Sequence, residues 1–278
     1  MSSTQKDHPT ILIFDSGVGG LSVYQEIRRL LPDAKYVYAS DNEAFPYGTK
    51  PEEMVVTRVD DVLHRLMARF VPDALVVACN TASTVALPKI RSRIFVPVVG
   101  VVPAIKPAAQ ISRSRVIGLL ATPATVERAY TQNLIDEFAR GCIVARVGSS
   151  ELVELAEDKL RGTAPDTERI RHIIAPLFNG ENGDKLDIVV LGCTHFPLLK
   201  PELASAAPRN VAWIDSGSAI AKRVRFLLKD ATASAGSEVQ SSQASENLHQ
   251  AAFTREGADA ASLEPALRRL GFARIVYI

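Results

Sequence analysis

Two stretches of the sequence decide the fold: DALVVACNT at residues 73–81 and DIVVLGCTH at residues 187–195. In each stretch an acid stands six positions before a cysteine, and a threonine follows the cysteine within two residues. The apolar run between acid and cysteine is short and continuous, which predicts a strand buried on both faces. The two cysteines lie 114 residues apart, so we infer that one structural unit occurs twice in the chain.

Apolar runs and amphipathic segments alternate along the rest of the chain. Further strands are expected at 11–14, 36–39, 97–101 and 116–121. Helices are expected at 21–31, at 152–160 and from Glu52 onward, the last with Thr49 as its N-cap. This alternation predicts an α/β fold of two similar lobes, each a mostly parallel sheet flanked by helices. We expect pseudo-two-fold symmetry between the lobes, with the active site between them.

Two segments, 102–107 and 213–217, are predicted to cross between the lobes. We therefore expect lobe one to comprise 1–103 and 215–278, and lobe two to comprise 104–214. Residues 231–246 are rich in Ser, Ala and Gln without an apolar stripe, which predicts a mobile surface loop.

Composition narrows the class of protein. The 278 residues are 47% hydrophobic and 23% charged, the usual mix of a soluble globular protein. A net charge of +1 provides no basic excess for a phosphate backbone, so we expect no nucleic-acid partner. No apolar run approaches the roughly 18 residues of a membrane span, so no membrane association is expected. Three cysteines and no apolar signal core predict a reduced, cytoplasmic protein.

Cys79 and Cys193 each follow a predicted strand directly, whereas Cys142 does not. A cysteine in such a place is most often a small buried hydrophobe. However, ligands bind at the carboxyl ends of strands in open α/β sheets. Each of these two cysteines also precedes a predicted helix start, whose amides favour a thiolate. Two facing lobes would then present two thiols from opposite sides of one cleft.

Three kinds of chemistry suit a pair of opposed thiols. A reversible disulfide is one, although the chain lacks a Cys-x-x-Cys motif. A metal site with His195 is another, but the Cys-Thr-His spacing is unusual and no second ligand pair accompanies it. The third is two-base proton transfer, in which a carbon loses its proton to one base and regains one on its opposite face. Inversion at that carbon is the result.

The glycine-rich stretch DSGVGG, residues 15–20, lies between a predicted strand and a helix. Such a turn can cradle a dinucleotide, but Ser22 stands in place of the third glycine and Asp15 would repel a phosphate. We therefore expect no nucleotide cofactor, and the glycines can serve simply to make a tight turn. Asp15 itself can bind an ammonium group or act as a base toward a thiol.

Several further polar residues are candidates for ligand binding. Tyr47 and Gly48 lie in a Pro-Tyr-Gly turn whose backbone N–H groups suit a carboxylate. Neutral donors are Ser16, Asn80, Thr81, Thr125 and Thr194. Many small donors and few fixed cations suit a small zwitterion better than a phosphate ester. Glu154 would ordinarily be a solvated helix charge, and His195 is either a structural histidine or an acid beside Cys193.

Four motifs resemble those of the glutamate racemase family in order and spacing. They are DSGVGGL at 15–21, Asp41 followed by PYG at 46–48, ACNTA at 78–82, and GCTHFP at 192–197. The resemblance extends from about residue 11 to 226 and implies two α/β lobes around one site. It also implies a cofactor-independent isomerase that interconverts L- and D-glutamate, with D-glutamate supplying peptidoglycan synthesis and hence cell shape.

The resemblance also implies roles for individual residues. Cys79 would act on the D-enantiomer with help from Asp15, and Cys193 on the L-enantiomer with help from Glu154 and His195. The implied substrate contacts are Asp15, Ser16, Tyr47, Gly48, Asn80, Thr81, Thr194 and His195. We expect glutamate as the small-molecule partner, no cofactor, no metal, and a homodimer.

Departures from the family pattern lie near the C-terminus, at 231–246 and 255–264, and they leave the oligomeric arrangement open. About ten residues precede the first strand, so the activation by a cell-wall precursor seen in some members with an N-terminal extension is not expected. Two competing hypotheses remain: a glutamate-binding protein that has lost catalysis, and a thiol–disulfide protein. The intact set of acid–base residues argues against the binding protein.

Overall fold

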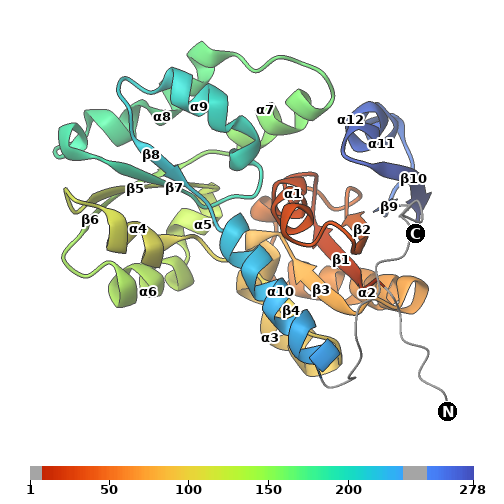
Figure 1. Ribbon diagram of the computed structural model, residues 1–278. Coiled ribbons are helices and arrows are strands. Elements are labelled where there is room, and N and C mark those ends of the chain that lie inside the picture. The colour runs from red at the N-terminus through yellow and green to blue at the C-terminus, as the bar shows by residue number, and fades with distance from the viewer. Residues whose placement is uncertain (1–7, 234–248) are drawn as a thin grey trace.

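The computed structural model describes residues 8–233 and 249–278, whose strands form two sheets (Figure 1). The larger sheet has the order β10-β9-β2-β1-β3-β4 and the smaller has the order β6-β5-β7-β8, with parallel pairing throughout. The strands are β1 (Thr10–Asp15), β2 (Lys35–Ser40), β3 (Ala74–Val77), β4 (Val98–Gly100), β5 (Val116–Ala121), β6 (Ile143–Gly148), β7 (Ile188–Leu191), β8 (Ala212–Ile214), β9 (His249–Phe253) and β10 (Phe272–Tyr277). The predicted α/β fold is confirmed.

Helices cover both faces of each sheet. They are α1 (Leu21–Leu30), α2 (Glu52–Phe70), α3 (Asn80–Arg93), α4 (Ile105–Ile111), α5 (Pro123–Glu127), α6 (Ala129–Phe138), α7 (Glu151–Leu160), α8 (Thr167–Asn179), α9 (Lys200–Ala206), α10 (Gly217–Ala233), α11 (Ala258–Ser262) and α12 (Glu264–Arg269). None of the helices in the described part of the chain is both long enough and apolar enough to cross a membrane.

The central strands β1, β3, β5 and β7 are mainly apolar because both of their faces are buried. Along β1, Ile11 and Ile13 pack in the core under α1 and α10, whereas Leu12 and Phe14 pack in the core under α2 and α3. All four side chains are fully buried, and complete burial of such a side chain contributes about 1.5–3 kcal/mol. The smaller sheet is built in the same way, with one core under α4 and α6 and another under α7, α8 and α9.

The repeated sequence corresponds to a repeated arrangement of strands. The order β2-β1-β3-β4 in the larger sheet matches β6-β5-β7-β8 in the smaller one, and β3 and β7 carry the two repeats. The acid that begins each repeat has a structural function. Asp73 Oδ2 accepts a hydrogen bond from the Thr10 N–H at 2.7 Å, and Asp187 Oδ2 accepts one from the Arg113 N–H at 2.8 Å. Each acid therefore accepts a hydrogen bond from a backbone N–H at or just before the start of the neighbouring strand.

The start of α2 corrects one sequence prediction. Thr49 does not cap this helix, because it belongs to the short 3-10 helix at Tyr47–Thr49, where its hydroxyl donates to the Pro46 carbonyl at 3.2 Å. The helix begins at Glu52, after Pro51, without a side-chain cap.

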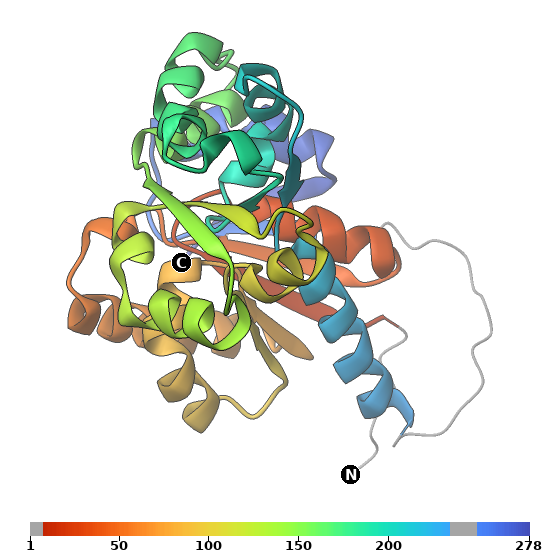
Figure 2. The ribbon, with the colours of Figure 1, turned by 90° about the vertical axis from the view of Figure 1, so that its left-hand side faces the viewer.

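The two predicted crossovers lie next to each other. The Ser216 hydroxyl donates to the Val102 carbonyl, which ties one crossover to the other. Beyond them, α10 returns to pack against α1 of the larger sheet (Figure 1 and Figure 2). The lobe boundaries given above stay a prediction. Of the predicted loop at 231–246, residues 231–233 end α10, and the remainder lies outside the described residues.

Candidate active site

A cavity of about 160 Å³ lies where strands of both sheets end. Asp15 and Cys79 reach it from the ends of β1 and β3, and Thr122 and Cys193 reach it from the ends of β5 and β7. All of the site residues predicted from the sequence line this cavity: Asp15, Ser16, Tyr47, Gly48, Cys79, Asn80, Thr81, Thr125, Glu154, Cys193, Thr194 and His195. Residues far apart in the sequence thus meet in one place.

Cys79 is the N-cap residue of α3, and its side chain is 6% exposed. Its Sγ accepts a hydrogen bond from the Ala82 N–H at 3.5 Å and lies 3.7 Å from the Ser16 hydroxyl. At Cys79 the helix amides were expected to favour a thiolate, but burial outweighs the amide contact. Burial, followed by the negative charge of Asp15, raises the pKa of Cys79 to about 12 despite the Ala82 contact. Cys79 is therefore a protonated thiol at neutral pH.

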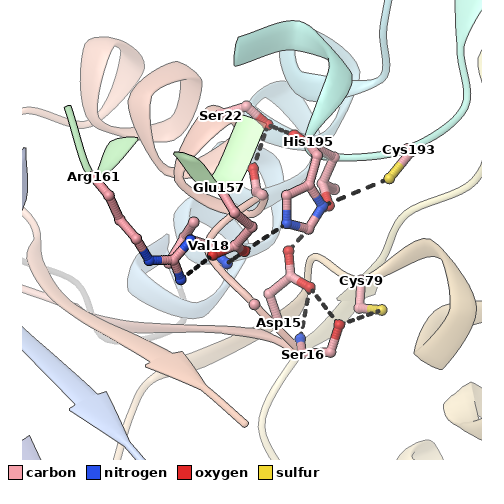
Figure 3. Close-up of polar contacts among 12 residues, drawn as sticks. Asp15, Ser16, Val18, Ser22, Cys79, Glu157, Arg161, Cys193 and His195 are labelled. Atoms are coloured by element: carbon pink, nitrogen blue, oxygen red, sulfur yellow. Dashed lines mark hydrogen bonds and ion pairs between the residues drawn. The ribbon is translucent and has the colours of Figure 1, made fainter. Parts of the chain in front are cut away.

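Asp15 connects the two halves of the site. Its Oδ1 accepts a hydrogen bond from the Ser16 N–H at 2.6 Å, and its Oδ2 accepts one from the Thr194 hydroxyl at 3.0 Å. Because Ser16 in turn contacts Cys79, a chain of polar contacts runs from Thr194 through Asp15 to the Cys79 sulfur. Figure 3 shows its part from Asp15 through Ser16 to Cys79. This carboxylate is 1% exposed and is connected to the Cys79 thiol through the Ser16 hydroxyl.

A second chain of contacts ends at the other sulfur (Figure 3). His195 Nδ1 lies 3.7 Å from Cys193 Sγ, and His195 Nε2 lies 2.9 Å from Glu157 Oε1. Glu157 Oε1 also accepts a hydrogen bond from the Val18 N–H at 2.9 Å, and its Oε2 accepts one from Arg161 at 2.7 Å. The order Arg161–Glu157–His195–Cys193 resembles the acid–histidine–nucleophile arrangement by which enzymes control a reactive group.

The charges on Glu157 and His195 follow from the contacts of these two side chains. Burial alone would lower the pKa of His195, but its hydrogen bonds to Cys193 and Glu157 hold that pKa well above the ordinary value. Burial would likewise raise the pKa of Glu157, but the contacts with His195, Val18 and Arg161 keep it below the ordinary value. Glu157 is thus a carboxylate and His195 an imidazolium, placed to exchange a proton with the Cys193 sulfur.

Glu157 is the residue that the sequence analysis missed. The predicted helper, Glu154, lines the cavity with an exposed side chain, whereas Glu157, one turn further along α7, contacts His195. Glu157 stands four residues after Val153 and three before Leu160, so helical periodicity places it on the apolar face. A carboxylate on an apolar face needs a partner, and this was the available signal.

The glycines of the DSGVGG turn allow a close approach between the two halves of the protein. A Cβ at Gly17 would lie 2.6 Å from Glu157 Oε1, and a Cβ at Gly19 would lie 2.5 Å from His195 Nδ1. Both distances are shorter than any van der Waals contact, so a side chain at either position would displace the Glu157–His195 pair. The turn therefore leaves room for the Glu157–His195 pair and places the Val18 N–H within hydrogen-bond distance of Glu157.

The structure also bears on the two alternatives to proton transfer, a disulfide and a metal site. Cys79, Cys142 and Cys193 are free cysteines. Over residues 8–233 and 249–278, no group of three or more His, Cys, Asp or Glu side chains is arranged to hold a metal ion. Within the described part of the chain, the buried Oδ1 atom of the cavity residue Asn80 has no hydrogen-bond partner. Because such an atom is costly to bury, it favours the binding of a ligand with a hydrogen-bond donor.

Comparison with known proteins shows the family of the chain. The family model for Asp/Glu/hydantoin racemases matches residues 11–224, so the chain belongs to that family and is an isomerase of the racemase class. Its relatives include the glutamate racemase of Salmonella typhimurium, which is 49% identical over 271 residues, covering 98% of this chain and 92% of the relative. The resemblance seen in the four sequence motifs is confirmed.

Two solved structures show the same likeness. A glutamate racemase from Escherichia coli, in complex with L-glutamate and the activator UDP-MurNAc-ala, has a TM-score of 0.89 and 46% identity over 98% of both chains. A glutamate racemase isoform from Bacillus anthracis has a TM-score of 0.78 and 29% identity, covering 98% of this chain and 97% of its own.

Proposed function

We propose that this racemase interconverts L- and D-glutamate by two-base proton transfer at the α-carbon, with Cys79 and Cys193 as the two bases. One observation carries the proposal: equivalent strands of the two sheets each bring a cysteine to the same cavity. Racemisation needs a proton removed from one face of the carbon and delivered to the other, and two facing thiols meet this need. The glutamate racemases among its relatives support the choice of substrate.

In the direction from L to D, Cys193 acts as the base. Its thiolate takes the α-proton from L-glutamate, the C–H electron pair remains on the substrate as a carbanion, and the Cys79 thiol gives its proton to the opposite face. Cys79 ends as a thiolate and Cys193 as a thiol, so the reverse reaction begins with the roles exchanged. No atom or electron is left over, and no redox partner is required.

The neighbours of each sulfur support these roles. Burial keeps the Cys79 thiol protonated, which is the state needed to deliver a proton in the L to D direction. For the reverse direction, Asp15 is the nearest carboxylate in the polar chain that leads to Cys79 through Ser16. On the other side, the imidazolium of His195 exchanges protons with Cys193 and is held in place by Glu157. Glu154 is proposed to act from the cavity lining.

The substrate contacts are proposed from the donors and acceptors around the cavity. Asp15, Ser16 and the Asn80 amide oxygen suit the ammonium group. The substrate carboxylates are assigned to Thr81, Thr125, Thr194, His195 and the backbone at Tyr47 and Gly48. A cavity of about 160 Å³ suits a ligand well below drug size.

A direct test follows the optical activity of pure L-glutamate, and separately of pure D-glutamate, with purified protein and no added cofactor. Both circular dichroism signals should decay to zero. Cys79→Ala and Cys193→Ala should each abolish the decay, because one thiol cannot serve both faces of the carbon. Wild-type turnover in both variants would overturn the mechanism. Glutamate that binds without losing its optical activity would favour the binding-protein alternative.

We also propose a cellular setting. The resemblance to glutamate racemases implies that the D-glutamate supplies peptidoglycan synthesis in the cytoplasm, and that the enzyme is a homodimer. Rescue of a bacterial strain that requires D-glutamate tests the first point, and failure of an expressed, folded protein to rescue would count against it. Light scattering coupled to size exclusion tests the second, since a mass near 30 kDa would exclude the dimer.

A further inference from the structure

A buried carboxylate lies beneath one wall of the substrate cavity. Asp41 follows β2 and is 0% exposed. Its Oδ2 accepts hydrogen bonds from the Tyr47 hydroxyl at 2.6 Å and from Arg58 Nε at 2.8 Å. Its Oδ1 accepts hydrogen bonds from Arg58 Nη2 at 2.7 Å and from the Thr254 hydroxyl at 2.7 Å. Both oxygens therefore carry two donors each.

This carboxylate is charged. Burial would raise the pKa of Asp41, but the hydrogen bonds from Arg58, Tyr47 and Thr254 outweigh burial and hold the pKa below its ordinary value. Hydrogen bonds to a charged acceptor are stronger than neutral ones, and a fully satisfied buried network is rigid. Asp41 therefore holds its donors in fixed places.

One of those donors is part of the substrate cavity. Pro46, Tyr47 and Gly48, called the 46–48 wall below, line the cavity. Tyr47 is 1% exposed, and its hydroxyl is committed to Asp41. The phenol oxygen thus serves as a tether for the 46–48 wall. The Asp41 N–H also donates to the Asp15 carbonyl at 2.9 Å, which ties the same residue to the backbone of the Asp15–Ser16 pair.

Another donor comes from the far end of the chain. Thr254 follows β9, which pairs with β2 in parallel so that Phe253 stands beside Ser40. The Thr254 N–H donates to the Ser40 carbonyl at 3.2 Å, and its hydroxyl accepts a hydrogen bond from the Glu43 N–H at 3.1 Å. Sheet register therefore places this hydroxyl at Asp41, although the two residues are 213 positions apart.

We propose that Asp41, held by hydrogen bonds from Arg58 and Thr254, is a positioning residue that fixes the 46–48 wall for substrate binding. Strand β9, through the Thr254 that follows it, would thereby contribute to glutamate affinity without touching the substrate. The inference rests on the proposed function, because it assigns the 46–48 wall to glutamate. The side-chain hydrogen bonds of Asp41 end on Tyr47, Arg58 and Thr254 rather than on either sulfur, so the network acts on binding more than on proton transfer.

The test compares Thr254→Val with Thr254→Ser. Valine has the shape of threonine but neither donates to Asp41 nor accepts from Glu43, whereas serine keeps the hydroxyl. For Thr254→Val the KM for both enantiomers should rise about fivefold, with kcat within about twofold of wild type. Thr254→Ser should keep both constants within about twofold of wild type. Tyr47→Phe cuts the tether itself and should raise KM at least as much.

The split between KM and kcat separates positioning from mere stability. A purely structural role would reduce the amount of active protein, so kcat would fall and KM would stay constant, and that result would overturn the inference. If Thr254→Val does not fold, Tyr47→Phe carries the same test. Wild-type protein without racemase activity would refute the proposed function, whereas active wild type with unchanged KM in the folded variants would refute only the positioning role.

Discussion

Glu157→Gln is expected to slow racemisation about 5- to 12-fold without unfolding the protein. Glu157 Oε1 lies 2.9 Å from His195 Nε2, both side chains are buried, and both are charged. A hydrogen bond that involves charged groups contributes about 1.5–3 kcal/mol. Glutamine keeps a neutral acceptor toward His195, and a neutral hydrogen bond contributes about 0.5–1.5 kcal/mol, so the lost charge costs about 1–1.5 kcal/mol. Because about 1.4 kcal/mol changes a rate tenfold, this cost corresponds to the stated range if the interaction stabilises the transition state through His195.

The variant should fold because glutamine preserves the shape of the side chain. Its amide oxygen can still accept the Val18 N–H, and its NH₂ group can turn toward Arg161. The side chain of Arg161 is 25% exposed, so it can move into solvent and avoid two facing donors. A change in activity would then reflect the lost charge, and thermal unfolding of the variant checks this point.

Circular dichroism of L- and D-glutamate measures the rate in each direction. Enantiomers have equal free energies, so kcat/KM must fall by the same factor in both directions. The pH profile adds a second readout. Burial lowers the pKa of His195, while Cys193 and Glu157 raise it. Without the Glu157 charge, His195 should lose its proton at lower pH, and the alkaline limb of kcat/KM should move to lower pH.

Two further substitutions on α7 serve as controls for Glu157→Gln. Asp158→Asn changes an exposed charge next to Glu157 and should leave the rate within about twofold of wild type. Glu154→Gln tests the carboxylate that the family resemblance implies as a helper of Cys193. A wild-type rate and pH profile for Glu157→Gln, together with a slow Glu154→Gln, would refute the reasoning.

Two other changes test the packing of the structure. Gly19→Ala should lower the rate by more than tenfold, because the new methyl group would lie 2.5 Å from His195 Nδ1, and a rate near wild type would show that the turn can shift. His249 is buried among aromatic rings, and burial lowers its pKa from 6.5 to about 4. Stability present above pH 6.5 should therefore fall by about 2 kcal/mol as pH drops toward 4, after allowance for solvent screening. His249→Phe should unfold in urea with less pH dependence, and an unchanged slope between pH 7 and pH 4.5 would count against this assignment.

Much of the fold could be predicted because buried parallel strands leave a direct signal. The run at 116–121 coincides with β5, and the apolar run of the second repeat coincides with β7 at 188–191. The location of the site could be predicted for the same reason. Parallel strands end at one edge, so polar residues that follow them gather there.

What the sequence did not reveal depends on contacts between distant segments. The Val18 N–H and Glu157 are 139 positions apart, and only the tertiary fold shows that Glu157 rather than Glu154 contacts His195. The state of Cys79 was mispredicted because local helix amides were considered without burial and without Asp15. Local rules describe the neighbours along the chain, but pKa values follow from all of the groups in space.

The central claim is that two different thiols serve the two faces of one carbon, and hydrogen isotope tracing tests it most directly. L-Glutamate is incubated in D₂O with the enzyme and examined by NMR and chiral separation at about a tenth of full conversion. The account predicts that D-glutamate carries deuterium from solvent at the α-carbon, because Cys79 delivers an exchanged proton, while the remaining L-glutamate stays unlabelled. D-Glutamate that retains the original hydrogen, or equal labelling of both enantiomers, would indicate a single base and contradict the account.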